Sequence, residues 1–326
     1  MKVYIDGAFF AEEDARISAI GNGFLKSKCL KECLVCRDGT FWGLDQRLEE
    51  LRTVAGELEM EFSWPPGDIR EALAVSYDRN GLKGKDASMT LILCEGRTSA
   101  KAEEVAEKKK NPEEAGAEGG ENSADGGTPE EDLPKEKKRL DDTGCTILPS
   151  CIVLCERREQ KAEDLLVPTK FISVENFPLG SDILQWERHC LGHLGHELAE
   201  GEARKKDASG AILVDGDGNV SGCTAGDIFV VQEKALLTPE FRKIDAVAKF
   251  SHGIIASDDR QIIQRKLSLQ DIKSAKEVFV FTHFDGVLPL TSIDDGPIGD
   301  GAVGSAVKLI ATDLPKKLIA ASKGAF

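Results

Sequence analysis

Val220-Ser221-Gly222-Cys223-Thr224-Ala225-Gly226-Asp227-Ile228-Phe229 is the stretch of sequence that decides the fold. Its apolar end continues through residue 231, and the short apolar run Ile228–Val231 predicts a buried strand. Immediately upstream, Ser209–Val214 and Gly218–Val220 flank the sequence Asp215-Gly216-Asp217-Gly218. Asp-Gly pairs favour tight turns, so we expect a hairpin here.

The rest of the chain predicts alternating strands and helices. Leucines and a valine recur at three- and four-residue spacing from Leu44 to Leu58, which indicates one apolar helix face, and the run from Ile69 to Val75 indicates a second helix. Further helices are expected over Leu184–Arg204, over Leu267–Ser274 and from Val307 onward. Short strands are expected at Met89–Leu93, Cys151–Leu154, Lys170–Val174 and Glu277–Phe281.

This alternation without a repeat predicts an α/β or α+β protein of two domains, with a small N-terminal domain over 1–165 and a larger C-terminal domain over 166–326. Residues 100–142 are rich in lysine and glutamate and then in glycine, serine and proline, and they contain no aromatic residue. Such a segment buries too little apolar area to offset the entropy of ordering it, so we predict a disordered acidic insertion in a surface hairpin. It is a solvated spacer or a docking segment for a basic protein surface.

Composition limits the partners and the location. The 326-residue chain carries a net charge of −15, which argues against nucleic acid or an anionic membrane as a partner. We find no apolar run of membrane-spanning length and no signal peptide, and we expect a cytoplasmic protein. The nine cysteines are odd in number and lack the spacing of a metal site, so we expect reduced thiols on strands.

Several fragments together resemble the class IV aminotransferases that depend on pyridoxal phosphate, which include the branched-chain and D-amino-acid aminotransferases and the aminodeoxychorismate lyases. The fragments are Asn22-Gly23-Phe24, the helix from Leu44 to Leu51, Gly210–Asp215 and Ile298-Gly299-Asp300-Gly301, together with the stretch 220–229. The resemblance implies the two-domain fold of D-amino-acid aminotransferase, with a cleft between the domains, and a homodimer.

The residues that this resemblance aligns with the cofactor anchors carry other chemistry. The lysine that forms the imine aligns with His189, the carboxylate beside the pyridine nitrogen with Gly222, and the phosphate-binding arginine with Glu50. The phosphate-binding turn aligns with Val247-Ala248-Lys249. Thr224, Asp227, Thr282 and His283 complete the positions of the remnant pocket.

Transamination needs an amine nucleophile and a protonated pyridine ring, and a phosphate needs a cation. We therefore predict a pseudoenzyme that binds no cofactor, has no catalytic residue and serves in binding, scaffolding or assembly. The alternative is a divergent pyridoxal-phosphate-dependent aminotransferase or lyase.

Histidines suggest a third interpretation, a metal-assisted enzyme. His189, His193 and His196 fall on one face of the expected helix over Leu184–Arg204, and this spacing is compatible with a metal ion. Leu191, Leu194 and Leu198 fall on the opposite face, which we expect to be buried. No further ligand is identifiable elsewhere in the sequence, so we commit to no metal site.

Overall fold

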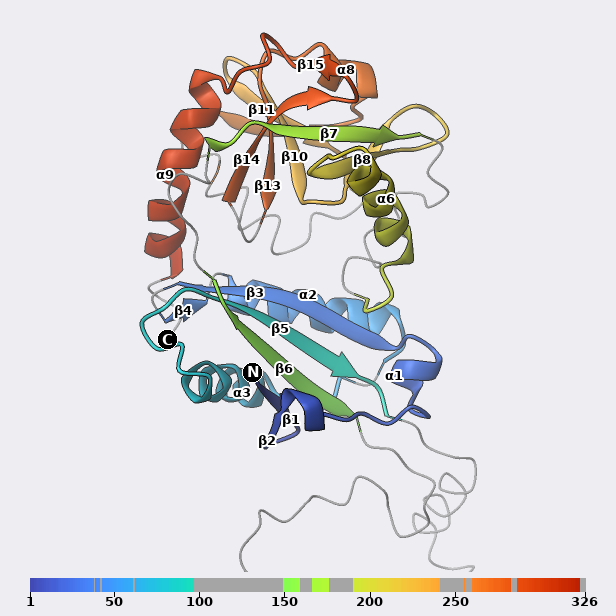
Figure 1. Ribbon diagram of the computed structural model, residues 1–326, viewed down its shortest axis with the longest axis vertical. Helices are drawn as coiled ribbons and strands as arrows, with labels where there is room; N and C mark the ends of the chain where they lie inside the picture. Colours follow the sequence, from blue (N-terminus) through green and yellow to red (C-terminus); the bar gives the residue numbers. More distant parts are fainter. Residues whose placement is uncertain are drawn as a thin grey trace, which may run out of the picture.

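The computed structural model describes residues 1–37, 39–41, 43–60, 62–96, 149–158, 166–175, 190–240, 255, 260–282 and 286–322. The side chains of residues 37, 315 and 318–322 are outside that description. Two sheets organise the chain, one of six strands and one of nine. Figure 1 shows the first sheet below the second.

The first sheet comes from the N-terminal half of the chain and has the order β2-β1-β6-β5-β3-β4. Every neighbouring pair in it is antiparallel. Its strands are β1 Lys2–Ile5, β2 Ala8–Ala11, β3 Cys29–Arg37, β4 Thr40–Phe41, β5 Ala87–Cys94 and β6 Ser150–Arg157. The helical segments of this half are η1 Glu12–Asp14, α1 Asn22–Leu25, α2 Leu44–Glu57 and α3 Pro66–Arg79.

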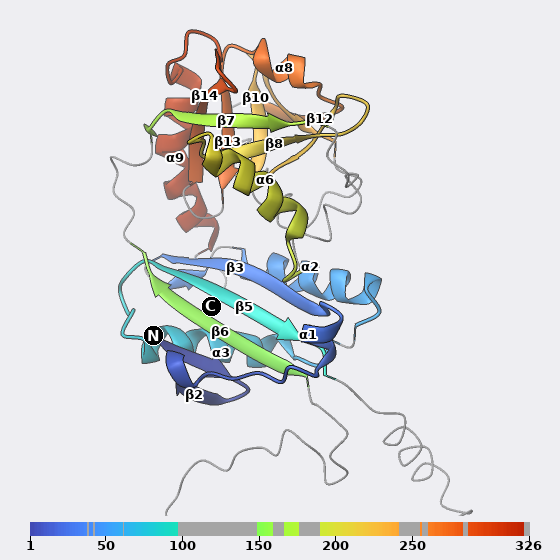
Figure 2. The same cartoon turned by 45° about the vertical axis from the view of Figure 1, so that its right-hand side comes forward.

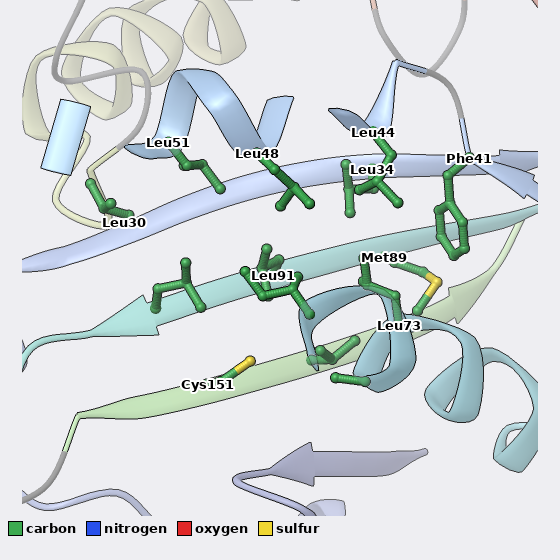
Figure 3. Packing of buried hydrophobic residues seen from close by; sticks show 14 of the residues in the cluster. Leu30, Leu34, Phe41, Leu44, Leu48, Leu51, Leu73, Met89, Leu91 and Cys151 are labelled. Carbon is green, nitrogen blue, oxygen red and sulfur yellow. The ribbon is translucent and has the colours of Figure 1, made fainter. Parts of the chain in front are cut away.

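Helices α2 and α3 cover one face of this sheet, because alternate residues of each strand point toward them. Figure 3 shows the packing, in which leucines of α2 lie over β3. The cluster includes Leu30 and Leu34 of β3, Met89 and Leu91 of β5, Leu44, Leu48 and Leu51 of α2, and Leu73 of α3. The apolar spacing read from the sequence is the spacing that fills this core.

The second sheet has the order β12-β11-β10-β13-β14-β7-β8-β9, with β15 paired to β14. Its strands are β7 Thr169–Val174, β8 Gly210–Val214, β9 Val220–Cys223, β10 Asp227–Val231, β11 Ala235–Pro239, β12 Gln261–Arg265, β13 Val278–Thr282, β14 Gly286–Ile293 and β15 Gly296–Pro297. The helices are α6 Leu194–Lys205, α8 Leu269–Lys273 and α9 Ser305–Ser322. Within the described ranges, no helix is long and apolar enough to cross a membrane.

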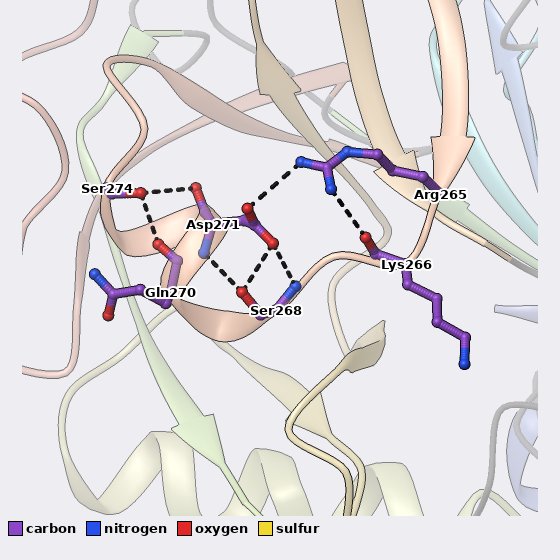
Figure 4. A network of polar contacts seen from close by, with 6 residues as sticks. All are labelled: Arg265, Lys266, Ser268, Gln270, Asp271 and Ser274. Carbon is purple, nitrogen blue, oxygen red and sulfur yellow. Dashed lines mark hydrogen bonds and ion pairs between the residues drawn. The ribbon is translucent and has the colours of Figure 1, made fainter.

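Helix α8 is fixed by a capping box (Figure 4). The Ser268 hydroxyl accepts a hydrogen bond from the Asp271 amide at 3.1 Å, and the Asp271 carboxylate accepts one from the Ser268 amide at 2.8 Å. The hydrogen bond from the Ser268 amide is the main cause that lowers the pKa of Asp271 below its ordinary value. Arg265 of β12 approaches the same carboxylate at 3.4 Å, so the capped helix is tied to the edge of the sheet.

Strand β3 connects the two halves of the chain. Leu30 pairs antiparallel with Cys190, and the Leu191 amide donates to the Cys29 carbonyl at 3.0 Å. Farther along β3, Val35 belongs to a buried cluster made with side chains of β10, β13, β14 and α9. In both Figure 1 and Figure 2, β3 is the long strand of the first sheet nearest the second sheet.

Most elements expected from the sequence are present. Both N-terminal helices, the strands near residues 90, 152, 172 and 280, the hairpin at 215–218 and the last helix are confirmed. Strands β11 and β12 were not predicted. The insertion 100–142 falls outside the described residues, and its docking role, like the domain division at residue 165, stays a prediction.

The predicted helix over Leu184–Arg204 is wrong at its start and in its buried face. Helix α6 begins at Leu194, and the backbone of Cys190 pairs with β3 instead. Leu191, Leu194 and Leu198 are 42%, 68% and 63% exposed. The helix instead buries Ala199 and Ala203 against Ala211 and Leu213 of β8, because small side chains allow the helix to lie close to the sheet.

The prediction that all cysteines are reduced is also wrong for two of them. Cys29 and Cys94 form a disulfide that joins β3 to β5 across 65 residues of sequence. Cys33, Cys36, Cys151, Cys155, Cys190 and Cys223 are free thiols. The strand placement expected for the two dense cysteine groups is correct where it is described, since Cys33 and Cys36 lie on β3 and Cys151 and Cys155 on β6.

Reduction of this disulfide is expected to lower the free energy of unfolding by roughly 4 kcal/mol, because an open loop of this length gains entropy in the unfolded chain. Thermal melts with and without a reducing agent measure the effect. The variant Cys33→Ser, which changes a free thiol on the same strand, serves as the control and should keep the full dependence on reductant. Equal melting temperatures with and without reductant would contradict the expectation.

Candidate functional site

The stretch between β9 and β10 is held against β8 by two hydrogen bonds. The Thr224 amide donates to the Ala211 carbonyl at 2.9 Å, and the Ala211 amide donates to the Thr224 hydroxyl at 3.0 Å. The Thr224 side chain therefore anchors backbone. Gly226 has φ of +156°, and a Cβ built there would lie 2.1 Å from the Phe281 carbonyl oxygen, so only glycine fits beside β13.

Asp227 and Thr282 lie side by side at the ends of two paired strands. Asp227 begins β10 and pairs with Phe281, whereas Thr282 ends β13 and pairs with Gly286 across the connection to β14. Both side chains are buried. Gly222, opposite Leu213 on β8, contributes only backbone to this end of the second sheet. The resemblance thus aligned residues that do come together here, and their polar groups are few.

The thiol next to this turn is not a nucleophile at neutral pH. Cys223 ends β9 and is buried. Loss of solvation on burial raises the pKa of the Cys223 thiol to about 12. Because only a thiolate attacks carbonyls or binds metal well, this cysteine is a structural residue of the turn.

Glu50 lies on α2 among buried charges that the sequence did not predict. It is 7% exposed, and Arg47, three residues earlier on the same helix, is 4% exposed. The Arg47 guanidinium forms an ion pair with the Glu32 carboxylate of β3 and donates to the Cys33 carbonyl at 3.2 Å. One cation and two carboxylates leave this group with an excess of one negative charge (+1 −2 = −1).

The excess negative charge is the main electrostatic feature of α2. An arginine that pairs with a buried carboxylate has little remaining attraction for a further anion. Glu50 adds a carboxylate at the position that the resemblance aligns with a phosphate-binding arginine. Charged residues in an otherwise apolar strand and helix face, Glu32 between Leu30 and Leu34 and Arg47 beside Leu48, were the signal from which this group could have been predicted.

Several predicted site residues lie outside the described residues. These are His189, Val247, Ala248, Lys249 and His283. Of the histidine face, His193 is the residue before α6 and His196 lies in its first turn, with their ring centroids 6.1 Å apart. Across the described ranges, no group of three or more histidine, cysteine, aspartate or glutamate side chains could hold a metal ion. The metal interpretation stays a prediction.

The comparisons with known proteins confirm the resemblance to class IV aminotransferases. The family model described as amino-transferase class IV matches residues 189–293. The chain is 23% identical over 315 residues to a Methanocaldococcus jannaschii protein inferred to be a branched-chain-amino-acid aminotransferase, covering 94% of this chain and 93% of that one. It is 20% identical over 325 residues to the D-alanine aminotransferase of Bacillus licheniformis, covering 98% of each.

Solved structures confirm the fold. A branched-chain amino acid aminotransferase from a source abbreviated T.th., solved with pyridoxamine 5′-phosphate, superposes with a TM-score of 0.73 at 18% identity. The match covers 97% of this chain and 93% of that chain. The fold is therefore the mixed α/β fold of class IV aminotransferases, as the sequence predicted.

The prediction that no cofactor binds is wrong. The family that matches the chain is that of the class IV aminotransferases, and a solved structure with the same fold holds pyridoxamine 5′-phosphate. Both findings point to pyridoxal phosphate. The prediction failed because it inferred loss of binding from loss of single anchors, whereas a cofactor also contacts backbone and the overall shape of its site.

The described residues fit such a cofactor only in part. The close packing at Gly226 and the buried Asp227 and Thr282 keep the end of the second sheet compact and polar. Glu50 and Gly222 do not fit, since one brings a negative charge toward a phosphate and the other offers no carboxylate to a pyridine nitrogen. We therefore derive no catalytic step through a cofactor.

The variant Arg47→Met is expected to destabilise the protein by about 3–5 kcal/mol, because it leaves the buried carboxylate of Glu32 without its cation. Denaturant unfolding followed by circular dichroism measures the change. The double variant Arg47→Met/Glu32→Met removes both charges and should recover most of the loss. A single variant within about 1 kcal/mol of the wild type would show that the pair contributes little.

Proposed function

We propose that this protein is a class IV aminotransferase-like protein that binds a pyridoxal-type phosphate compound between its two halves and does not transaminate branched-chain or D-amino acids. Its role is then one of binding or assembly. The observation that carries the proposal is the buried group of Glu32, Arg47 and Glu50, in which the only arginine is already paired.

The sequence supports the same conclusion at the nucleophile. The position that aligns with the lysine of the family holds His189, and an imidazole forms no stable imine with an aldehyde. When bound, pyridoxal phosphate supplies an electron sink for carbanion chemistry, which works only with a protonated ring and a nearby base. With Gly222 in place of a carboxylate, the chain lacks a side chain that would keep the ring protonated.

The alternative function is that of a divergent aminotransferase or lyase. The observation that favours it is the length of the similarity, since the D-alanine aminotransferase of Bacillus licheniformis matches over 98% of both chains. Whether the altered positions still permit chemistry decides between the two functions. A direct assay for cofactor attachment separates them.

The purified protein is expected to bind pyridoxal 5′-phosphate reversibly, without an absorbance band of a protonated imine. Borohydride reduction followed by peptide mapping should find no phosphopyridoxyl-lysine, and leucine or D-alanine with 2-oxoglutarate should give no product. The variant His189→Lys/Gly222→Glu/Glu50→Arg is the matched control and should gain the imine band. A phosphopyridoxyl-lysine in the wild-type protein would establish the alternative.

We also propose that the protein forms a homodimer through an apolar patch that comprises Phe24 and Leu25 of α1 together with Leu191, Leu194 and Leu198. All five side chains are at least 42% exposed. The two parts are close, because a Cβ at Gly192 would lie 3.7 Å from the Ser27 hydroxyl oxygen. In Figure 1 and Figure 2 the N-terminal end of α6 points toward the end of the first sheet where α1 lies.

Contiguous exposed leucines and phenylalanine are typical of protein interfaces, and a symmetric dimer would cover the same patch on both chains. The variant Leu194→Glu/Leu198→Glu is expected to weaken the dimer on the order of 100-fold or more, because each leucine contributes about 1.5–3 kcal/mol when buried. Light scattering after size exclusion gives the mass. Leu309→Glu, which charges an exposed leucine of α9, should stay dimeric, and a monomeric wild-type protein would refute the dimer.

A further inference from the structure

Lys31 lies in β3 on the face of the first sheet that α2 and α3 leave open. Its neighbours Leu30 and Glu32 point toward the helices, where they pack in the core and pair with Arg47. Because side chains alternate along a strand, Lys31 points to the other face. There it stands opposite Ile92 of β5, and Thr90 stands opposite Cys33 on the same face.

This face of β3 borders the second half of the chain. Leu30, the residue before Lys31, pairs with Cys190, which is the residue after position 189. Val35, two residues beyond Cys33 on the same face, packs in the cluster that contains Phe279, Phe281 and residues of α9. Lys31 therefore lies between two contacts with the C-terminal half, next in space to the strand end that follows His189.

The ammonium group of Lys31 differs from the other cations of this region. Arg47 pairs with Glu32, and Lys28 pairs with Glu95 at 3.3 Å. Lys31 is half-buried, and within the described part of the chain its ammonium forms no hydrogen bond and no ion pair. A half-buried charge without a counter-ion is unfavourable unless a ligand supplies one.

We propose that Lys31 is the cation that binds the anionic group of the ligand, a phosphate or a carboxylate. The inference rests on the proposed function, in which a pyridoxal-type phosphate compound or an amino or 2-oxo acid occupies the region between the halves. The hydroxyl of Thr90 on the same face offers a neutral hydrogen bond near this charge. Lys31 thus provides the positive charge that Glu50 does not provide on α2.

Equilibrium binding to the full-length protein tests this inference, with three probes: pyridoxamine 5′-phosphate, pyridoxamine without phosphate, and 4-methyl-2-oxopentanoate. The variant Lys31→Met should raise the Kd of at least one anionic probe about 10- to 100-fold, the usual effect of losing a charged hydrogen bond, while Lys31→Arg should retain binding. Lys234→Met, which removes an exposed lysine of the β10–β11 turn, is the control with the same change of charge. Melting temperatures of all variants show whether each one is folded.

A loss confined to pyridoxamine 5′-phosphate assigns the phosphate to Lys31, and a loss confined to the 2-oxo acid assigns the carboxylate. If Lys31→Met binds both anionic probes as the wild type does, the inference is overturned while the proposed function stands. If Lys234→Met loses as much affinity as Lys31→Met, the effect is one of net charge and the inference is equally overturned. A wild-type protein that binds none of the probes overturns both.

Discussion

A guanidinium group buried beside two carboxylates is the constraint on which the character of this protein depends. Arg47 reaches across from α2 to Glu32 of β3, and its partner carboxylate occupies the capacity that would otherwise attract an anion. Burying charges costs several kcal/mol per ion unless each is compensated, so this group is retained only as a unit. The family fold is kept around it, and the electrostatics of the site are changed by it.

The sequence predicted the fold well because the fold depends on patterns of apolar residues. The spacing from Leu44 to Leu58 predicted α2, and the short branched runs predicted β5 and β13. The failure at α6 has a physical cause. Leu194 and Leu198 repeat with helical spacing, but the helix packs through alanines, and apolar spacing alone does not say which face meets the same chain and which is left exposed.

The candidate site was only partly predictable, because it depends on pairing across long distances in the sequence. The alignment identified Glu50 and Gly222 as departures from the family, but nothing in the sequence joined Arg47 to Glu32 or Cys29 to Cys94. The setting of Lys31 depends on the register of β3 with β5 and on the bridge to Cys190. Binding of a cofactor was misjudged for the same reason, since identities at single positions do not describe a whole site.

The disulfide between Cys29 and Cys94 stands at the base of the long connection from β5 to β6. Cys94 also pairs with Ser150, so both ends of that connection are fixed by the sheet itself. When the ends are fixed, lengthening a connection costs only about 0.6 kcal/mol for each doubling of its length. The connection is therefore free to gain or lose residues during evolution without disturbing the strands, and variation in length among related chains should concentrate there.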